Sequence, residues 1–259
     1  MFDMLKIRIN QGSQAIKDVR KAVIPLPFRG FPVISPQECK GDNKACNACL
    51  EGCPTNAIHI NQETRKLSID IGKCVFCGDC VRNCKENKIA FSNFHKIAAT
   101  NPNTLVLEAG MTPEDFYSNA IKARDQIKKI FGRSLKLRQV SAAGCNGCEM
   151  ELNACSNVNF DMQRFGIEFV ASPRHADGIV ITGPISQNMS FAVEDTFNAV
   201  PQPRIVILVG SCAISGGVFA SSPALNREFL EKYPVDLYIP GCPTHPLTFI
   251  NGVLDFLGQ

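Results

Sequence analysis

The sequence has no apolar run long enough to cross a lipid bilayer. The longest runs, such as Ile205 to Val209, fall far short of the about 20 residues that a membrane-spanning helix needs. The first ten residues alternate charged with apolar side chains and lack the continuous apolar stretch of an export signal. We therefore expect neither secretion nor a direct membrane span, so that any membrane attachment would come through partner proteins.

The chain also lacks a strong charge of either sign. Its formal net charge is only +3, from 27 lysines and arginines against 24 acids. The basic residues are interspersed with acidic ones and do not form a stripe, so nucleic-acid binding is not indicated.

Cysteine, by contrast, is plentiful, with 13 residues distributed unevenly. Eight fall between Cys39 and Cys84, and the other five lie between Cys145 and Cys242. Without an export signal these thiols are expected to stay reduced, and clustered reduced thiols usually bind metal or carry out redox chemistry. The distribution predicts two regions of different construction.

The first region contains a duplicated cysteine motif. Its last four thiols have the spacing C-x2-C-x2-C-x3-C: Cys74, Cys77, Cys80 and Cys84. Three more repeat the last three positions 31 residues earlier: Cys46, Cys49 and Cys53. In such runs three thiolates bind one iron-sulfur cluster and the fourth binds the other cluster of the pair.

The first position of the upstream copy departs from this pattern. Asn43 stands there, and the nearest thiol is Cys39, which we interpret as an insertion of four residues. Gly41 and Asp42 favour turns, so a small loop could return Cys39 to the cluster. If it does not, that cluster would hold three irons or be labile.

The spacing predicts two sets of four ligands, each for a 4Fe-4S cluster. The first set is Cys39, Cys46, Cys49 and Cys84. The second set is Cys53, Cys74, Cys77 and Cys80. A pair of zinc sites is the alternative, because C-x2-C also suits tetrahedral zinc. Interleaved groups of three with a remote fourth favour clusters.

Short alternating segments accompany these thiols. Residues 57–60 and 66–70 are expected to be strands around a polar turn at 61–64, and residues 88–92 are similar. Together with the eight thiols, these features resemble a bacterial-type 2x(4Fe-4S) ferredoxin domain over about residues 28–94. The resemblance is to the ferredoxin-like subunits of formate hydrogenlyase and complex I, and it implies an α+β ferredoxin-like fold.

The pattern then changes. Thr112 and Pro113 predict the start of a surface helix running to about Phe131. Its apolar stripe recurs every three or four residues: Phe116, Ala120, Ala123, Ile127 and Ile130. Five β-branched-rich strands are expected beyond it: 135–140, 167–170, 178–182, 205–209 and 235–239. Helical patterns intervene at 191–199, 225–232 and 248–257.

Alternating strands and helices predict a mostly parallel α/β sheet, which binds ligands beyond the carboxyl ends of its strands. Four thiols follow such ends and form a third set: Cys145, Cys148, Cys212 and Cys242. We expect them to converge on one cluster. Cys155 lies outside this pattern and is expected to be a buried thiol that binds no metal.

Four motifs in this half resemble the small subunit of energy-converting NiFe hydrogenases, including formate hydrogenlyase. They are Gly-Cys145-Asn-Gly-Cys148-Glu-Met-Glu151, Ser172-Pro-Arg-His-Ala-Asp177, Thr182-Gly-Pro-Ile and Ile239-Pro-Gly-Cys242-Pro. The resemblance spans about residues 128–258 and implies a flavodoxin-like α/β domain whose third set binds the proximal 4Fe-4S cluster. The homologous B subunit of complex I has adjacent cysteines where this chain has a spaced pair, which favours a hydrogenase.

Three further side chains are candidates for tuning that cluster: Arg174, His175 and His245. Nearby positive charge and hydrogen bonds raise a cluster's potential, and a histidine can couple electron uptake to protonation. A histidine that only packs a loop is the simpler alternative. Glu149 and Glu151 are two apart on a helix, so at most one should face the cluster.

These features divide the chain into a ferredoxin domain at 1–95, a linker and surface helix at 96–127, and a hydrogenase small-subunit-like domain at 128–259. The resemblance implies an electron-transfer subunit of a NiFe hydrogenase, which passes electrons through three 4Fe-4S clusters to or from the large partner subunit. No nickel site, and so no catalytic residue, is expected in this chain, because hydrogenase nickel is held by two C-x2-C pairs and every thiol here except Cys155 is assigned to a cluster.

The implied partners are the large subunit, membrane-arm subunits, and a donor or acceptor such as a ferredoxin or a formate dehydrogenase module. They would place the chain in the cytoplasm, peripherally on the inner membrane. One alternative is the equivalent subunit of a complex I-like oxidoreductase that uses quinone or another acceptor. Another is a zinc-stabilised scaffold that transfers no electrons.

Overall fold

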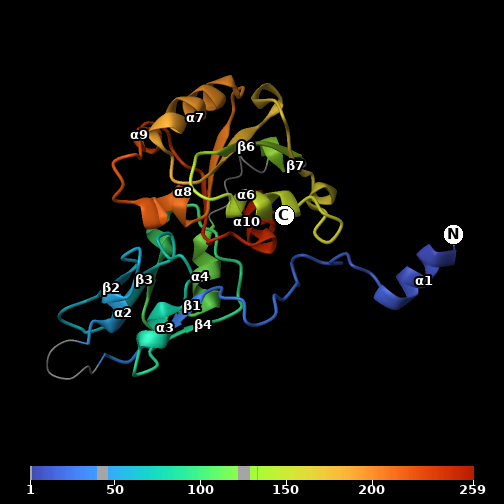
Figure 1. Cartoon of the computed structure of the whole chain (residues 1–259). Helices are drawn as coiled ribbons and strands as arrows, with labels where there is room; N and C mark the ends of the chain where they lie inside the picture. Colours follow the sequence, from blue (N-terminus) through green and yellow to red (C-terminus); the bar gives the residue numbers. More distant parts are fainter. Residues whose placement is uncertain (1, 40–45, 122–128, 133) are drawn as a thin grey trace.

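A computed structural model describes residues 2–39, 46–121, 129–132 and 134–259. Two units pack together, and helix α1 (Phe2–Gln11) projects from them with none of its residues buried (Figure 1). No helix in the described part of the chain is both long and apolar enough to cross a bilayer.

The first unit contains two small antiparallel sheets. Strand β1 (Pro32–Ile34) pairs with β4 (Ile89–Phe91). The other sheet has the order β2-β3-β5, with these bounds: β2 Ile58–Ile60, β3 Leu67–Asp70 and β5 Val106–Glu108. The strands predicted at 57–60, 66–70 and 88–92 are confirmed. Two short helices carry cysteines: α2 (Ala48–Glu51) and α3 (Asp79–Asn83).

The predicted surface helix is shorter than expected. Helix α4 (Pro113–Ala120) begins as predicted, because the side chain of Thr112 accepts a hydrogen bond from the Asp115 N–H at 3.1 Å. The prediction of one helix to Phe131 was wrong, since Ile121 is extended and the Ala120 carbonyl accepts a hydrogen bond from Thr100 N–H. Residues 129–131 are helical again, and two stripe residues lie outside the described residues: Ala123 and Ile127.

Helix α4 and β5 both belong to the first unit. Phe116 and Ala120 are buried in its core, where Phe116 packs against Phe31 with ring centroids 5.6 Å apart. Strand β5 joins the sheet through β3. The segment after residue 95 therefore packs against the ferredoxin-like core.

The second unit is built on a parallel sheet of five strands in the order β10-β9-β8-β6-β7. Their bounds are β6 Leu135–Ser141, β7 Ile167–Phe169, β8 Gly178–Thr182, β9 Ile205–Val209 and β10 Leu237–Ile239. The predicted strands are confirmed. Every residue of the central strands β8 and β9 is buried, as expected for a sheet covered on both faces.

Helices connect and cover these strands (Figure 1). The α-helices are α6 Gly147–Ala154, α7 Gln187–Ala199, α8 Ser211–Ser215, α9 Glu228–Lys232 and α10 Pro246–Phe256. Short 3-10 helices are η1 Pro102–Leu105, η2 Met162–Phe165, η3 Pro173–His175 and η4 Gly217–Phe219. Helix α10 is almost entirely buried and forms part of the core of the second unit.

A segment near the amino terminus straps the second unit. Val19 and Ile24 are buried in its core, although they precede the first unit in the sequence. The Ile16 N–H donates to the Asn159 carbonyl at 2.8 Å, and the amide nitrogen of Asn251 in α10 donates to the Val19 carbonyl at 3.0 Å. The chain thus crosses the second unit before it forms the first.

The two units also share a backbone connection. Ala99 and Tyr238 exchange two hydrogen bonds, each 2.9 Å long, beside the edge strand β10. This bridge joins the first unit to the edge strand β10 of the parallel sheet.

The strap gives a testable prediction for stability. Replacing Asn251 by Ala leaves the buried Val19 carbonyl without its donor, so we expect the free energy of unfolding to fall by about 1–3 kcal/mol. The matched control is Asn153→Ala on the exposed face of α6, which should change it by less than about 0.5 kcal/mol. Denaturant titration followed by circular dichroism measures both, and equal effects would contradict the role of the strap.

Candidate metal centres

The first set of cysteines comes together around α2 and the end of α3. Burial, followed by the charges of the other three members of the set, raises the pKa of the Cys49 thiol to about 11. Burial also raises the pKa of Cys39, with contributions from Glu86 and then Cys84. Cys39 lies beside the turn between β2 and β3, since its N–H donates to the Arg65 carbonyl at 3.2 Å. The structure therefore places Cys39 with the rest of the first set.

The second set comes from three places: Cys53 follows α2, Cys74 and Cys77 lie on the loop that leads into α3, and Cys80 lies in α3. Burial, together with the charges of nearby Cys53 and Cys77, raises the pKa of Cys74 to about 12 and that of Cys80 to about 11. All four thiols line one small cavity. Backbone N–H groups point at the sulfurs of both ferredoxin sets at 3.2–3.3 Å: Ala57 to Cys53, Phe76 to Cys74 and Lys88 to Cys84.

The third set gathers at the carboxyl edge of the parallel sheet, as expected. Cys145 and Cys148 follow β6, Cys212 follows β9 in α8, and Cys242 follows β10. Burial, followed by the charges of Glu149, Cys242 and Cys212, raises the pKa of Cys148 to about 12. Burial likewise raises the pKa of Cys212 to about 11, followed by the effects of Cys242 and Cys145.

The donor chemistry of the three sets fits iron-sulfur clusters. Burial favours the neutral thiol, whereas a cationic metal centre deprotonates the thiols that bind it. Amide donors near sulfur stabilise the negative charge of a cluster and tune its potential. Among the described residues, no group of three or more His, Cys, Asp or Glu side chains is placed to hold a single metal ion.

The second and third sets adjoin each other across the two units. The pKa of Cys242 is raised by its burial, then by Cys145 and by Cys77 of the second set. The Ser211 hydroxyl, one residue before Cys212, lies 2.5 Å from the Cys74 carbonyl oxygen. The first and second sets are interleaved through α2 and α3. The spatial order is therefore first set, second set, third set.

The structure separates the three tuning candidates. Arg174 and His175 are exposed in η3, just before the amino end of β8, and no described contact joins them to a cysteine. His245 lies closer, between the rings of Phe28 and Phe160 at 5.4 and 5.9 Å. Its Nδ1 accepts the Leu247 N–H at 3.1 Å and so caps α10, while burial lowers its pKa and keeps it neutral.

Of the two glutamates, Glu149 is the one beside the third set. Its charge raises the pKa of both Cys148 and Cys212. The Thr182 hydroxyl donates to its Oε1 at 2.6 Å, while its Oε2 is buried without a partner among the described groups. Glu151 instead lines a cavity between the units.

Sequence reasoning missed Arg227. Its guanidinium donates to four carbonyl oxygens, those of Pro184, Cys212, Ala213 and Ile214, at 2.8–3.2 Å. It therefore caps the short helix that carries Cys212. No spacing or composition marks an arginine 15 residues away as a cap. Cys155 caps the carboxyl end of α6 and is fully buried, and its thiol donates to the Glu151 carbonyl, as expected for a thiol outside the sets.

Gly210 gives a prediction specific to the third set. It has φ +88°, and an added Cβ would lie 2.5 Å from the Cys148 sulfur. We expect Gly210→Ala to displace that ligand and remove about four of about twelve irons per chain. Gly12→Ala is the control, because Gly12 has φ +68° but open space around it. Iron analysis after gel filtration measures both, and full iron in Gly210→Ala would contradict the assignment.

Comparison with known protein families agrees with this geometry. Residues 145–256 match the family described as NADH ubiquinone oxidoreductase, 20 Kd subunit. Residues 44–88 match the 4Fe-4S dicluster domain. The first match covers the third set and the second covers seven of the eight thiols of the first and second sets.

Individual relatives come from several kinds of redox complex. A probable membrane-bound hydrogenase subunit of Pyrococcus furiosus is 39% identical over 50% of this chain and 77% of its own length. Formate hydrogenlyase subunit 7 of Escherichia coli is 40% identical over 51% of each chain. The B subunit of the NADH-quinone oxidoreductase of Heliobacterium modesticaldum is 36% identical over 59% of this chain and 87% of its own. A chain of the archaeal membrane-bound sulfane sulfur reductase aligns with a TM-score of 0.44, at 30% identity over 51% of this chain and 73% of its own.

The matched residues are those that carry the third set at the edge of the parallel sheet, and the dicluster match precedes them in the same chain. The chain belongs to the family of the 20 kDa subunit of NADH ubiquinone oxidoreductase, which includes hydrogenase subunits, and it is an oxidoreductase subunit with a fused 4Fe-4S dicluster domain.

Proposed function

We propose that this chain relays electrons through three 4Fe-4S clusters, bound in order by the first, second and third sets, to or from a NiFe large subunit. The observation that carries the proposal is the adjacency of the second and third sets, where Cys77 raises the pKa of Cys242 and Ser211 reaches the Cys74 carbonyl. Clusters supply one-electron redox chemistry at potentials that the protein sets. The chain fixes their order and surrounds each set with burial and amide donors.

A second candidate is a complex I-like oxidoreductase that uses quinone or another acceptor, because NADH-quinone oxidoreductase subunits are among the relatives. The spaced pair Cys145 and Cys148 favours the hydrogenase. Two relatives that cover half of this chain are a probable membrane-bound hydrogenase subunit and a formate hydrogenlyase subunit. We therefore rank the hydrogenase first.

We further propose a flavodoxin-like classification for the second unit. Numbered along the chain, its strands have the spatial order 2-1-3-4-5, which is the order of that fold. The proposed domains are 1–95, 96–127 and 128–259, with residues 16–24 strapped onto the last and β5 and α4 packed on the first.

The exposed face around the third set is an argument for a large partner subunit that covers it. Cys145 and Cys242 are exposed, unlike the buried Cys49 and Cys80. Large apolar side chains are exposed on α6, which carries Cys148, and on η4 after Cys212: Met150, Val218 and Phe219. A cluster and apolar groups left in water would be disfavoured, so a protein surface that covers them fits this face. Membrane-arm subunits would then hold the complex at the inner membrane, on its cytoplasmic face.

Metal analysis of the complex purified with its partners tests the proposal. We expect about twelve irons and twelve sulfides from this chain, together with nickel in the large subunit and hydrogen uptake. Clusters without nickel or hydrogen uptake would favour the quinone candidate. Zinc in place of iron would show a scaffold and overturn both redox functions.

Cys39 and Cys155 form a matched pair of variants. Cys39→Ser removes a ligand of the first set, so we expect the first cluster to be lost or converted to a three-iron form, which has its own electron paramagnetic resonance (EPR) signal when oxidised. Cys155→Ser should leave every cluster in place, because Cys155 is buried away from the sets. An unchanged spectrum for Cys39→Ser, or lost iron for Cys155→Ser, would show that the ligand assignment is wrong.

A further inference from the structure

The loop from Cys74 to Cys77 forms the boundary between the second and third sets. Phe76 adopts φ +53°, a left-handed conformation that a bulky residue rarely takes. Such a conformation persists only where surrounding contacts hold it. The described contacts of this loop show what holds it.

One contact comes from the second unit. Ser211 is 1% exposed, and its Oγ lies 2.5 Å from the Cys74 carbonyl and 3.2 Å from the Gly241 carbonyl. A hydroxyl has one proton, so its stronger hydrogen bond goes to Cys74. Because Ser211 directly precedes Cys212, this hydrogen bond joins the loop of the second set to a ligand of the third.

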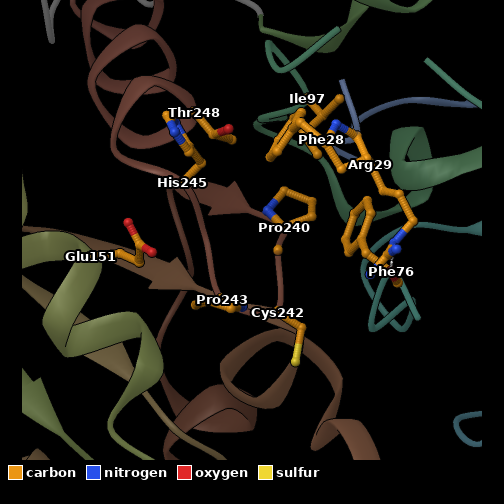
Figure 2. Close-up of a pocket in the computed structure, with 12 residues that line it drawn as sticks. Phe28, Arg29, Phe76, Ile97, Glu151, Pro240, Cys242, Pro243, His245 and Thr248 are labelled. Atoms are coloured by element: carbon orange, nitrogen blue, oxygen red, sulfur yellow. Dashed lines mark hydrogen bonds between the residues drawn. The ribbon is translucent and has the colours of Figure 1, made fainter. Parts of the chain in front are cut away.

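The other contact comes from Arg29. Its Nε donates to the Phe76 carbonyl at 2.5 Å. The neighbouring Gly30 fixes its backbone, since the Gly30 N–H donates to the Ser92 carbonyl and a Cβ there would lie 2.1 Å from the Phe94 carbonyl oxygen. Figure 2 shows Arg29 beside Phe76 on one side of a cavity of about 270 Å³, with Cys242 across it.

Ser211 and Arg29 donate to the carbonyls of Cys74 and Phe76, the residues on either side of Val75. With those carbonyls engaged, the Phe76 N–H remains directed at the Cys74 sulfur at 3.3 Å. Neither donor points at a sulfur itself. Their effect on the second set therefore comes through the position of the loop.

We propose that Ser211 and Arg29 are positioning residues that clamp the Cys74–Cys77 loop and so set electron transfer between the second and third clusters. This inference rests on the proposed function. The step moves one electron from the reduced second cluster to the oxidised third, or back, and no bond forms or breaks. Tunnelling falls steeply with distance, and amide hydrogen bonds to sulfur tune the potential, so a displaced loop changes both rate and driving force.

The test uses the full chain in its complex. Ser211→Ala removes the cross-unit hydrogen bond, and Arg29→Lys keeps the charge but loses the Nε donor. We expect each to weaken the spin–spin coupling between the reduced second and third clusters in EPR spectra. We also expect about a tenfold slower transfer in freeze-quench experiments. In redox titrations we expect the midpoint potential of the second cluster to shift by up to about 59 mV, which corresponds to a tenfold change in the equilibrium constant of a one-electron step.

Ser215→Ala is the matched control, because Ser215 lies on the same helix and its hydroxyl, which donates to the Ser211 carbonyl and accepts the Gly217 N–H, makes no described contact with the Cys74–Cys77 loop. Coupling, rate and midpoint should match wild type there. If Ser211→Ala behaves like Ser215→Ala, or Arg29→Lys like wild type, the clamp is wrong. If Ser211→Ala loses iron, the Arg29→Lys variant decides whether the clamp exists, because Arg29 is exposed and its replacement leaves the core intact. Wild-type protein without second- and third-cluster signals would overturn the proposed function, and the clamp with it.

Discussion

Four thiolates cannot share a half-buried volume unless positive charge lies among them. Burial, together with the negative charges of neighbouring cysteines, raises the pKa of Cys74 and Cys148 to about 12. Metal binding offsets this cost, and its free energy then becomes part of the folding free energy. The short helices α2, α3 and α8 each carry one cysteine of a set. None of them is long enough to be stable alone, so metal binding would help to stabilise them.

The joining of two folds in one chain has a physical consequence at their seam. A ferredoxin-like unit and a parallel sheet could meet in many orientations; in this chain residues 16–24 pack on the second unit, and the bridge between Ala99 and Tyr238 joins the first unit to it in one of them. That orientation brings the loop of the second set to the strand ends of the third. The order of the clusters is thus a property of backbone packing, while their potentials depend on local donors such as those around Cys74.

Much of this could be predicted from the sequence, since cysteine spacing and strand periodicity are local signals. The three sets and the predicted strands needed no tertiary information. The break at Ile121 could not be predicted, because it depends on Thr100, about 20 residues away. The contacts of Ser211, Arg29 and Arg227 join segments with no shared pattern. His245 has a role that its position after Cys242 did not indicate, because its Nδ1 caps α10.

The central claim is that three clusters lie in one ordered path within this chain. Anomalous diffraction at the iron edge, from crystals of the complex, tests it most directly. We expect three separate iron sites, with the middle one inside the Cys74–Cys77 loop and the last at the edge of the parallel sheet beside Cys212. Zinc scattering at these positions, or no iron among the third set, would contradict it.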